Sequence, residues 1–129
     1  MKVLIVDDLK LVRVVSRKIL TTALNKHFDK PEIECSDSGM DAVFRCRNRE
    51  YDLILMDVMM PGFDGIRATR TIRRIGENKQ TYIAGFSFKQ NDRATVLRAT
   101  EAGVDSFIPK PLDPVFLDRF LQDEFWANK

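Results

Sequence analysis

The stretch YDLILMDVMMPGFDG, residues 51–65, contains an apolar run that ends in a carboxylate. Residues 53–56 are all apolar, and a run of this length fits a strand buried on both faces. Asp57 follows directly, and Pro61 with Gly62 then marks a turn. Strands buried on both faces are typical of parallel sheets, which predicts that Asp57 stands at the carboxyl end of such a strand.

Short apolar runs alternate with longer amphipathic stretches along the rest of the chain. Five of these runs predict strands, at residues 3–6, 33–35, 53–56, 82–86 and 107–108. The predicted helices are the segment whose inward face is Val12, Val15, Ile19 and Ala23, and then residues 39–49, 65–75, 92–102 and 114–126. Five β-α units of this size predict an α/β fold with a parallel sheet covered by helices on both faces, because each parallel crossover needs a dozen or more residues.

Polar residues and glycine mark the predicted helix ends. Asp64 is predicted to cap the third helix, and Gly103 to end the fourth. Asp113 and Pro114 supply a cap and a first helical residue for the fifth. The second strand alternates glutamates with apolar residues, so we expect it at an edge of the sheet.

Size and composition predict one domain, residues 1–129. The net charge is +2, because 21 Lys and Arg nearly cancel 19 Asp and Glu, and this balance favours neither nucleic acid nor a membrane surface as a direct partner. The apolar run before Asp7 is too short for a signal peptide, so we expect a cytoplasmic protein. Cys35 and Cys46 fit no metal or redox spacing, and His27 has no second histidine with which to bind a metal.

Four charged residues follow strand ends. Asp7 and Asp8 come after the first strand, Asp57 after the third, and Lys110 after the fifth. Ligands of an open parallel sheet bind beyond the carboxyl ends of its strands, so we expect these side chains to converge. The three acids and one base leave two negative charges uncompensated, which a divalent cation would neutralise. Oxygen ligands favour Mg²⁺, with Mn²⁺ as the alternative, and a carboxylate beside the ion can form an aspartyl phosphate.

Each of these residues alone has an ordinary structural explanation. Asp7 with Asp8 fits a helix N-cap and its neighbour. Asp57 fits a turn residue, and Lys110 fits a solvated surface lysine. Their common position at strand ends, in this order and spacing, favours a functional site.

Further short motifs lie near the ends of the predicted strands and helices. They are Val6-Asp7-Asp8, Ser38-Gly39, LILMDVMMPGFDG around Asp57, Ser87, EAGVDSF, and Lys110-Pro111. With these motifs the chain resembles the receiver domains of two-component response regulators over essentially its whole length. The resemblance implies a flavodoxin-like (βα)5 doubly wound parallel sheet with strand order 2-1-3-4-5.

The resemblance also implies a phosphoacceptor with a metal beside it. Asp57 would accept a phosphoryl group from a phosphohistidine of a histidine kinase or a histidine phosphotransfer protein. Asp8, Asp57 and the backbone carbonyl of Met59 would hold Mg²⁺, and Asp7 would reach the ion through water.

Other residues are implied to bind and sense the phosphoryl group. Lys110 would pair with one phosphoryl oxygen and Ser87 would donate a hydrogen bond to another. The Lys110–Pro111 peptide bond is expected to be cis. Phosphorylation is expected to draw Ser87 inward, which lets Phe107 turn from outside to inside. Because Phe107 carries no hydroxyl group, we expect its inward state to be populated easily.

The sequence departs from the family pattern after Ser87. Phe88 stands where a small residue is usual, and is expected to narrow access to the phosphoryl group. Lys89 is expected to alter the attack of water on the aspartyl phosphate. The segment from Ser87 to Gly103 is about one residue longer than usual, by comparison with the family.

Three predicted helices carry charged or aromatic side chains that the packing of the core does not require. The first has exposed cations on the surface where the family meets its phosphodonor: Lys10, Arg13, Arg17 and Lys18. The third has a basic side, which is either a solvated face or a docking surface: Arg67, Arg70, Arg73 and Arg74. The fifth has aromatic residues that serve either the core or an interface: Phe116, Phe120, Phe125 and Trp126.

The favoured function is a stand-alone receiver that switches its binding to a downstream protein target. We expect a monomer or a phosphorylation-dependent dimer, and no enzymatic activity beyond self-catalysed phosphorylation and slow autodephosphorylation. One alternative is the receiver portion of a longer DNA-binding regulator, and another is a degenerate receiver that acts by binding alone. A phosphohydrolase is disfavoured, because Met59 stands where its second acid is expected.

Overall fold

The computed structural model describes residues 1–87 and 92–126, so Phe88 and Lys89 lie outside the described residues. Strands and helices alternate along the chain: β1 (Lys2–Val6), α1 (Lys10–Asn25), β2 (Glu32–Ser36), α2 (Gly39–Cys46), β3 (Leu53–Asp57), α3 (Gly65–Arg74), β4 (Tyr82–Ser87), α4 (Arg93–Ala102), β5 (Ser106–Pro109) and α5 (Pro114–Phe120). A π-helical segment, η1 (Leu121–Phe125), continues α5.

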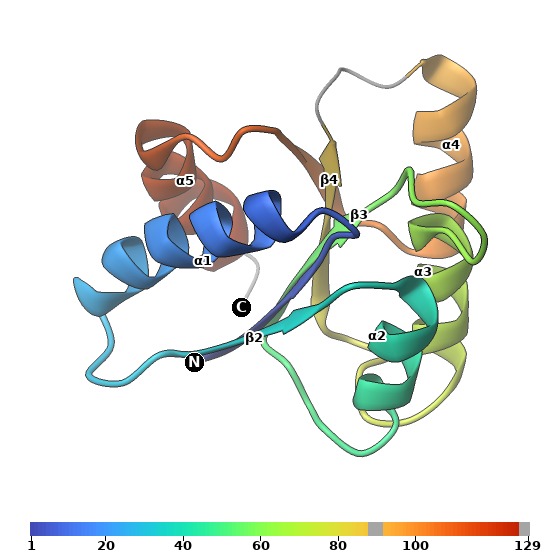
Figure 1. Cartoon of the computed structure of the whole chain (residues 1–129), viewed down its shortest axis with the longest axis horizontal. Coiled ribbons are helices and arrows are strands. Elements are labelled where there is room, and N and C mark those ends of the chain that lie inside the picture. Colours follow the sequence, from blue (N-terminus) through green and yellow to red (C-terminus); the bar gives the residue numbers. More distant parts are fainter. Residues whose placement is uncertain (88–91, 127–129) are drawn as a thin grey trace.

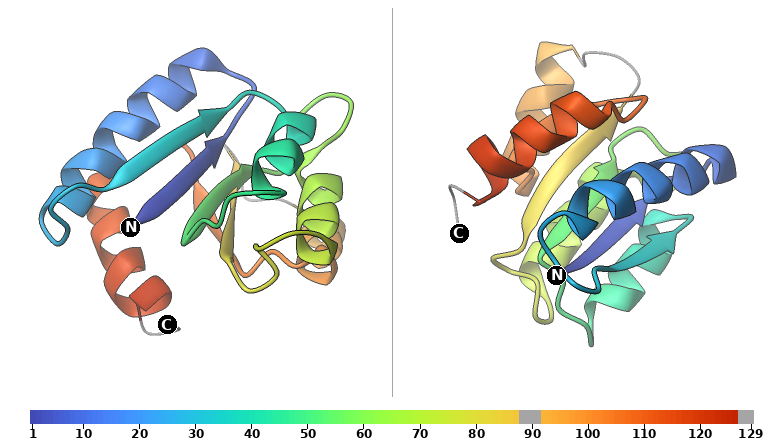
Figure 2. Two further views of the ribbon diagram at one scale, coloured as in Figure 1. Left: turned by 90° about the horizontal axis from the view of Figure 1, so that it is seen from below. Right: turned by 90° about the vertical axis from the view of Figure 1, so that its left-hand side faces the viewer.

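The strands form a parallel sheet in the order β2-β1-β3-β4-β5, which confirms the predicted fold class. The strand order reverses between β1 and β3, because the chain moves outward to β2 before it returns to β3. Helices α1 and α5 cover one face of the sheet, and α2, α3 and α4 cover the other (Figure 1; Figure 2, right). Strand β2 lies at one edge, as predicted, and β5 lies at the other.

The central strands divide their side chains between two cores. In β3, Leu53 and Leu55 pack with α1 and α5, whereas Ile54 and Met56 pack with the helices of the other face. Successive residues of a strand point to opposite faces, so a strand covered on both sides must be apolar throughout. The uninterrupted apolar run that precedes Asp57 therefore follows from burial on both sides.

The predicted helix caps are present. The Asp64 carboxylate accepts a hydrogen bond from the backbone N–H of Arg67 at 2.9 Å, and Asp113 accepts one from Phe116 at 2.8 Å. Gly103 ends α4 with a φ of 118°, a conformation that favours glycine.

Two predictions about helices were wrong in detail. The inward face of α1 contains Ser16, which is 2% exposed, whereas Val15 is 41% exposed. Ser16 continues the face of Val12 by four residues, but a serine does not stand out in an apolar pattern. Helix α2 ends at Cys46, before the predicted 39–49 segment is complete, and the Asn78 side chain donates a hydrogen bond to the Cys46 carbonyl at 2.9 Å.

Arg73 does not share the exposed basic side predicted for the third helix. Its guanidinium group donates to the Gly103 carbonyl at 2.7 Å and pairs with Asp105 at 2.9 Å. The group also bonds the carbonyl of Thr81, so Arg73 ties α3 to the chain before β4 and to the end of α4. The other three arginines of α3 are exposed.

The aromatic residues near the C-terminus mostly serve the core. Phe120 and Phe125 are buried, and their rings meet the Tyr82 ring edge to face with centroid distances of 5.6 and 5.7 Å. Phe116 is 38% exposed. Within the described residues, no helix has both the length and the apolar character needed to cross a bilayer.

Candidate functional site

The predicted acidic residues meet at the carboxyl edge of the sheet. Strands β1 and β3 are neighbours, with Val6 opposite Met56, so the residues that follow them emerge side by side. Asp7, Asp8 and Asp57 each offer one carboxylate oxygen, and these three oxygens lie within 4.8 Å of one another. The reversal of strand order between β1 and β3 therefore gathers three carboxylates at one point.

Lys110 reaches the same point from the end of β5. The Lys110–Pro111 peptide bond is cis, and the Lys110 backbone N–H donates to the Ser87 carbonyl at 2.6 Å. The Lys110 ammonium nitrogen lies 3.2 Å from Asp57 Oδ2 and forms a close ion pair with Asp7 Oδ2. Asp7, Asp8, Asp57 and Lys110 are called the acidic site below.

Three of the four charged side chains of the acidic site are buried, so their charges are poorly solvated. Asp7 is 0% exposed, Asp57 4% and Lys110 6%, whereas Asp8 is exposed at the rim. Burial raises the pKa of Asp57 to about 6, although the Met59 backbone N–H and the Lys110 ammonium group oppose this change, and the Asp7 charge adds to it. The Met59 N–H and the Lys110 ammonium group therefore do not offset the effect of burial on the Asp57 carboxylate.

The loop after β3 is held against the acidic site. The backbone N–H of Met59 donates to Asp57 Oδ1 at 3.0 Å, and the Met59 side chain is 66% exposed. A Cβ atom at Gly65 would lie 2.0 Å from the Asp57 carbonyl oxygen, so only glycine lets α3 begin this close to β3. Gly65 is not among the predicted site residues. The sequence feature that points to it is a glycine at the first position of a predicted helix.

Arg13 has a role that the sequence analysis did not identify. Its guanidinium group donates to the backbone carbonyl of Asp7 at 2.8 Å, so Arg13 braces the turn that presents the two β1 acids. Arg13 was predicted to be one of the exposed cations of the first helix, but in the structure it is half-buried. The first turn of helix α1 thus holds the backbone at Asp7 in place through the Arg13 side chain.

Ser87 and Phe107 flank the acidic site on the β4 side. Ser87 ends β4, one residue after the Phe86 that pairs with Asp57. Phe107 pairs with Gly85, and a Cβ atom at Gly85 would lie 2.7 Å from the Phe107 ring. The ring therefore lies directly over Gly85, partly buried against the core on the α2–α4 face.

Comparison with known proteins identifies the family. Residues 3–122 match the response regulator receiver domain. The chain belongs to this family. The receiver is 31% identical over 113 residues to the chemotaxis protein CheY of Thermotoga maritima, with 88% of each chain covered. It is 36% identical over 113 residues to the transcriptional regulatory protein ResD of Bacillus subtilis, of which the match covers 43%. The receiver thus spans less than half the length of ResD.

Solved structures agree with this assignment. The receiver superposes on the chemotaxis protein CheY4 of Vibrio cholerae with a TM-score of 0.81 and 26% identity, covering 94% of this chain and 95% of that one. The receiver domain of the sensor histidine kinase PA1611 from Pseudomonas aeruginosa gives a TM-score of 0.79 at 26% identity, covering 94% and 93%. That structure has a magnesium ion coordinated in its active site cleft. The receiver is therefore a signalling domain of the two-component class.

Proposed function

We propose that the receiver accepts a phosphoryl group on Asp57 and thereby switches its binding to a downstream protein target. The observation that carries this proposal is the buried Asp57 carboxylate, which lies among two other carboxylates and 3.2 Å from the Lys110 ammonium nitrogen. A carboxylate held in this way is positioned to act as a nucleophile.

The residues of the acidic site fit a magnesium ion. All side-chain donors are carboxylate oxygens, which suit Mg²⁺ or Mn²⁺ rather than zinc. Asp8, Asp57 and the backbone carbonyl of Met59 would hold the ion, and Asp7 would contact it through water. When bound, the ion supplies positive charge against the phosphoryl oxygens. The magnesium ion in the PA1611 receiver domain supports this assignment.

The chemistry requires an ionised Asp57. A carboxylate oxygen of Asp57 forms a bond to the phosphorus atom, the bond from phosphorus to the histidine nitrogen breaks, and its electron pair returns to the imidazole ring. Because the pKa of Asp57 is about 6 without metal, the carboxylate is mainly ionised at neutral pH. Lys110 would bind one phosphoryl oxygen and Ser87 would donate to another, which neutralises and orients the transferred group.

The switch would involve β4 and β5. Phosphorylation adds about −1.5 to −2 charge and three acceptor oxygens beside Ser87. Movement of Ser87 toward these oxygens would change the space around the Phe107 ring, which already lies over Gly85. The same chemistry serves a stand-alone receiver and the receiver portion of a longer regulator.

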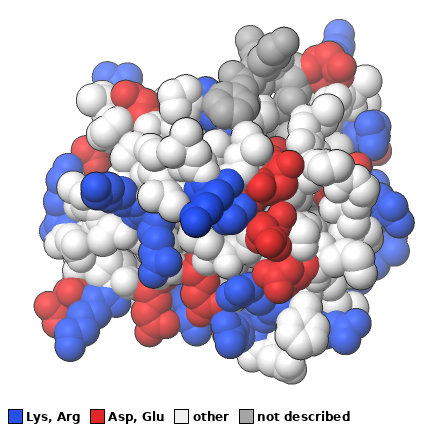
Figure 3. Space-filling model, in the orientation of Figure 1, with Lys and Arg blue, Asp and Glu red and all other residues white. Residues whose placement is uncertain are grey.

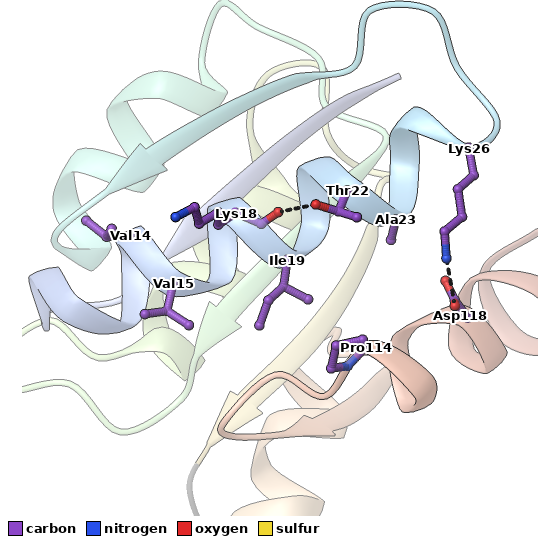
Figure 4. A pocket seen from close by; sticks show the side chains of 9 residues that line it. All are labelled: Val14, Val15, Lys18, Ile19, Thr22, Ala23, Lys26, Pro114 and Asp118. Atoms are coloured by element: carbon purple, nitrogen blue, oxygen red, sulfur yellow. Dashed lines mark hydrogen bonds and ion pairs between the residues drawn. The ribbon is translucent and has the colours of Figure 1, made fainter.

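The groove between α1 and α5 is the proposed contact for the phosphodonor. Figure 4 shows Val15 and Ile19 of α1 pointing to the side on which Pro114 of α5 lies. These residues line a groove of about 450 Å³. Helix α1 contains no acidic residue, and the surface over it is mainly white and blue in Figure 3. Because α1 begins two residues after Asp8, a partner helix seated here brings its phosphohistidine to the acidic site. We place this transfer from a histidine kinase or phosphotransfer protein in the cytoplasm.

Intact-mass measurement tests the proposal. The receiver is incubated with acetyl phosphate and Mg²⁺, and we expect the mass to increase by one phosphoryl group and then to fall slowly as the adduct hydrolyses. Asp57→Asn and excess EDTA should each abolish the increase. Absence of an adduct in the unaltered protein would contradict the proposal and favour a receiver that acts by binding alone, whereas many turnovers on phosphate esters would indicate a phosphohydrolase.

A further inference from the structure

Helix α2 exposes two large apolar side chains that the proposed function does not use. Met40 is 69% exposed and Phe44 is 68% exposed. They are four residues apart, so they lie next to each other on one side of the helix. Together with Val43, Arg47 and Phe63 they line a groove of about 240 Å³, which we call the α2 groove. Neighbouring large apolar side chains on a surface often mark a binding site.

The far wall of the α2 groove comes from the loop after β3. A Cβ atom at Gly39 would lie 2.3 Å from the Phe63 carbonyl oxygen and 3.0 Å from its ring. The start of α2 therefore packs against this loop at a distance that only glycine permits. Because backbone touches backbone here, Phe63 is held in place and the groove has a fixed wall.

The rim of the α2 groove is positive. Arg47 lines it, and the Arg67 guanidinium carbon lies 4.9 Å from the centre of the Phe63 ring. No acidic residue lines the groove. Within residues 1–87 and 92–126, no ion pair involves Arg47 or Arg67. Arg74 is exposed seven residues after Arg67, on the same side of α3.

Acids on and beside α2 and α3 have other partners: Asp64, next to Phe63, accepts a hydrogen bond from the Arg67 backbone N–H at 2.9 Å. Asp41 Oδ2 lies 2.8 Å from the Arg45 Nε atom, and Glu34 Oε1 lies 2.8 Å from an Arg49 nitrogen. The charges of Arg47 and Arg67 are therefore available to a partner. An apolar floor between two such arginines matches a partner that presents apolar side chains flanked by carboxylates.

We propose that the α2 groove binds an acidic amphipathic helix of another protein. Apolar side chains spaced at i, i+3, i+4 and i+7 on that helix contact Met40, Phe44 and Phe63. Its carboxylates pair with Arg47 and Arg67. A second copy of the receiver fits poorly, because a two-fold contact would bring the same arginines together. A membrane surface fits poorly as well, because the apolar side chains line a concave groove.

A peptide-binding experiment tests the proposal. The probe is a fluorescein-labelled peptide of about four helical turns, with Leu at the i, i+3, i+4 and i+7 positions and Glu elsewhere. A matched peptide carries Lys in place of Glu. We expect the acidic peptide to bind the receiver in the micromolar range by fluorescence anisotropy, and the basic peptide to bind at least about tenfold more weakly.

Matched variants locate the binding. Phe44→Ala should weaken the acidic peptide by about tenfold, and Arg47→Glu with Arg67→Glu by more than that in low salt. Leu97→Ala, on α4, removes a side chain of similar exposure, 59%, and should change nothing. Because Phe44 and Leu97 are both exposed, neither change should unfold the protein, and circular dichroism checks this.

Four outcomes would overturn the proposal. They are no saturable binding of the acidic peptide up to about 1 mM, equal binding of both peptides, full binding by Phe44→Ala, or equal loss in Leu97→Ala. Two further assays test the other occupants. Phe44-dependent binding to phosphatidylserine vesicles would assign the groove to membranes, and Phe44-dependent self-association in sedimentation velocity would assign it to contacts between receiver copies.

Discussion

Two charged clusters of the receiver have opposite compositions. In the acidic site, three carboxylates share one ammonium group, and two of those carboxylates are buried. At the β2 edge, the Glu34 carboxylate is surrounded by donors. Its Oε1 atom accepts from Arg49 at 2.8 Å, from Arg45 at 3.2 Å and from the Tyr51 hydroxyl at 2.8 Å, and Lys2 lies 3.9 Å from Oε2.

The two clusters shift their carboxylates in opposite directions. Burial raises the pKa of Glu34, but hydrogen bonds from Tyr51 and Arg49 outweigh it, so the net pKa lies below the ordinary value. At Asp57 burial dominates, and the pKa rises to about 6. Glu34 is surrounded by donors of the chain itself, whereas Asp57 lies beside two further carboxylates and a single ammonium group. The surroundings of Glu34 therefore favour its ionised form, whereas burial of Asp57 opposes ionisation, a pattern that is common at functional sites.

The largest effect is expected when the acidic site loses a charge. Asp57→Asn should stabilise the metal-free receiver by about 2 to 3 kcal/mol at pH 7, because two pKa units correspond to about that free energy. The raised pKa means that Asp57 contributes stability below the unfolded pKa near 4, and that this contribution is lost as the pH rises through about 6. Urea unfolding in EDTA measures the difference.

The control for this prediction is the pH itself. Near pH 4 both Asp57 in the folded protein and its asparagine replacement are neutral, so the two proteins should have nearly equal free energies of unfolding. A stabilisation that is equal at pH 4 and pH 7 would show that the uncompensated charge is not its cause.

A smaller effect is expected in the affinity for Mg²⁺. Because the ion and a proton compete for Asp57, the apparent affinity should fall by about tenfold for each pH unit below 6 and should change little between pH 7 and pH 8. Isothermal titration calorimetry of the unphosphorylated receiver measures the affinity. A constant affinity between pH 5 and pH 7 would be inconsistent with a raised pKa at Asp57.

The smallest effect is expected at the β2 edge, and its sign is opposite. Glu34→Gln should destabilise the receiver by about 1 kcal/mol, because Arg49 loses its carboxylate partner, Arg45 and Lys2 each lose one of two, and solvent screens part of the loss. The lowered pKa means that Glu34 contributes stability above its unfolded pKa, which is lost as the pH falls through the lower folded value. Urea unfolding at pH 7 measures this, with Glu32→Gln as the exposed control. A stabilised Glu34→Gln protein would remove the contrast between the clusters.

The fold and the centre of the acidic site could be predicted because both depend on local sequence signals. Apolar runs of strand length, capped helices and acids at strand ends are all visible along the chain. The order of β1 and β3 then follows from the family resemblance, and it brings Asp7 and Asp8 to Asp57.

The features that could not be predicted depend on contacts between distant segments. Arg73 belongs to a row of arginines in the sequence, and only the fold shows that it bonds the carbonyl of Gly103, 30 residues away. Helix α2 stops where the side chain of Asn78, from another loop, bonds the Cys46 carbonyl. Ser16 is buried because it lies with Val12 and Leu20 on the side of α1 that packs on the core, which the serine itself does not reveal in the sequence. The α2 groove likewise needs Phe63, which lies far along the chain from Phe44.

The two outer strands of the sheet protect it against aggregation. Strand β2 carries glutamates along its length, and Lys2 pairs with one of them, Glu32, at 3.7 Å. Strand β5 has only four residues and ends at Pro109, whose nitrogen carries no hydrogen. Charged or short outer strands discourage a second chain from adding a strand of its own. Pairing of the sheet with a strand of another chain is therefore disfavoured at both of its edges.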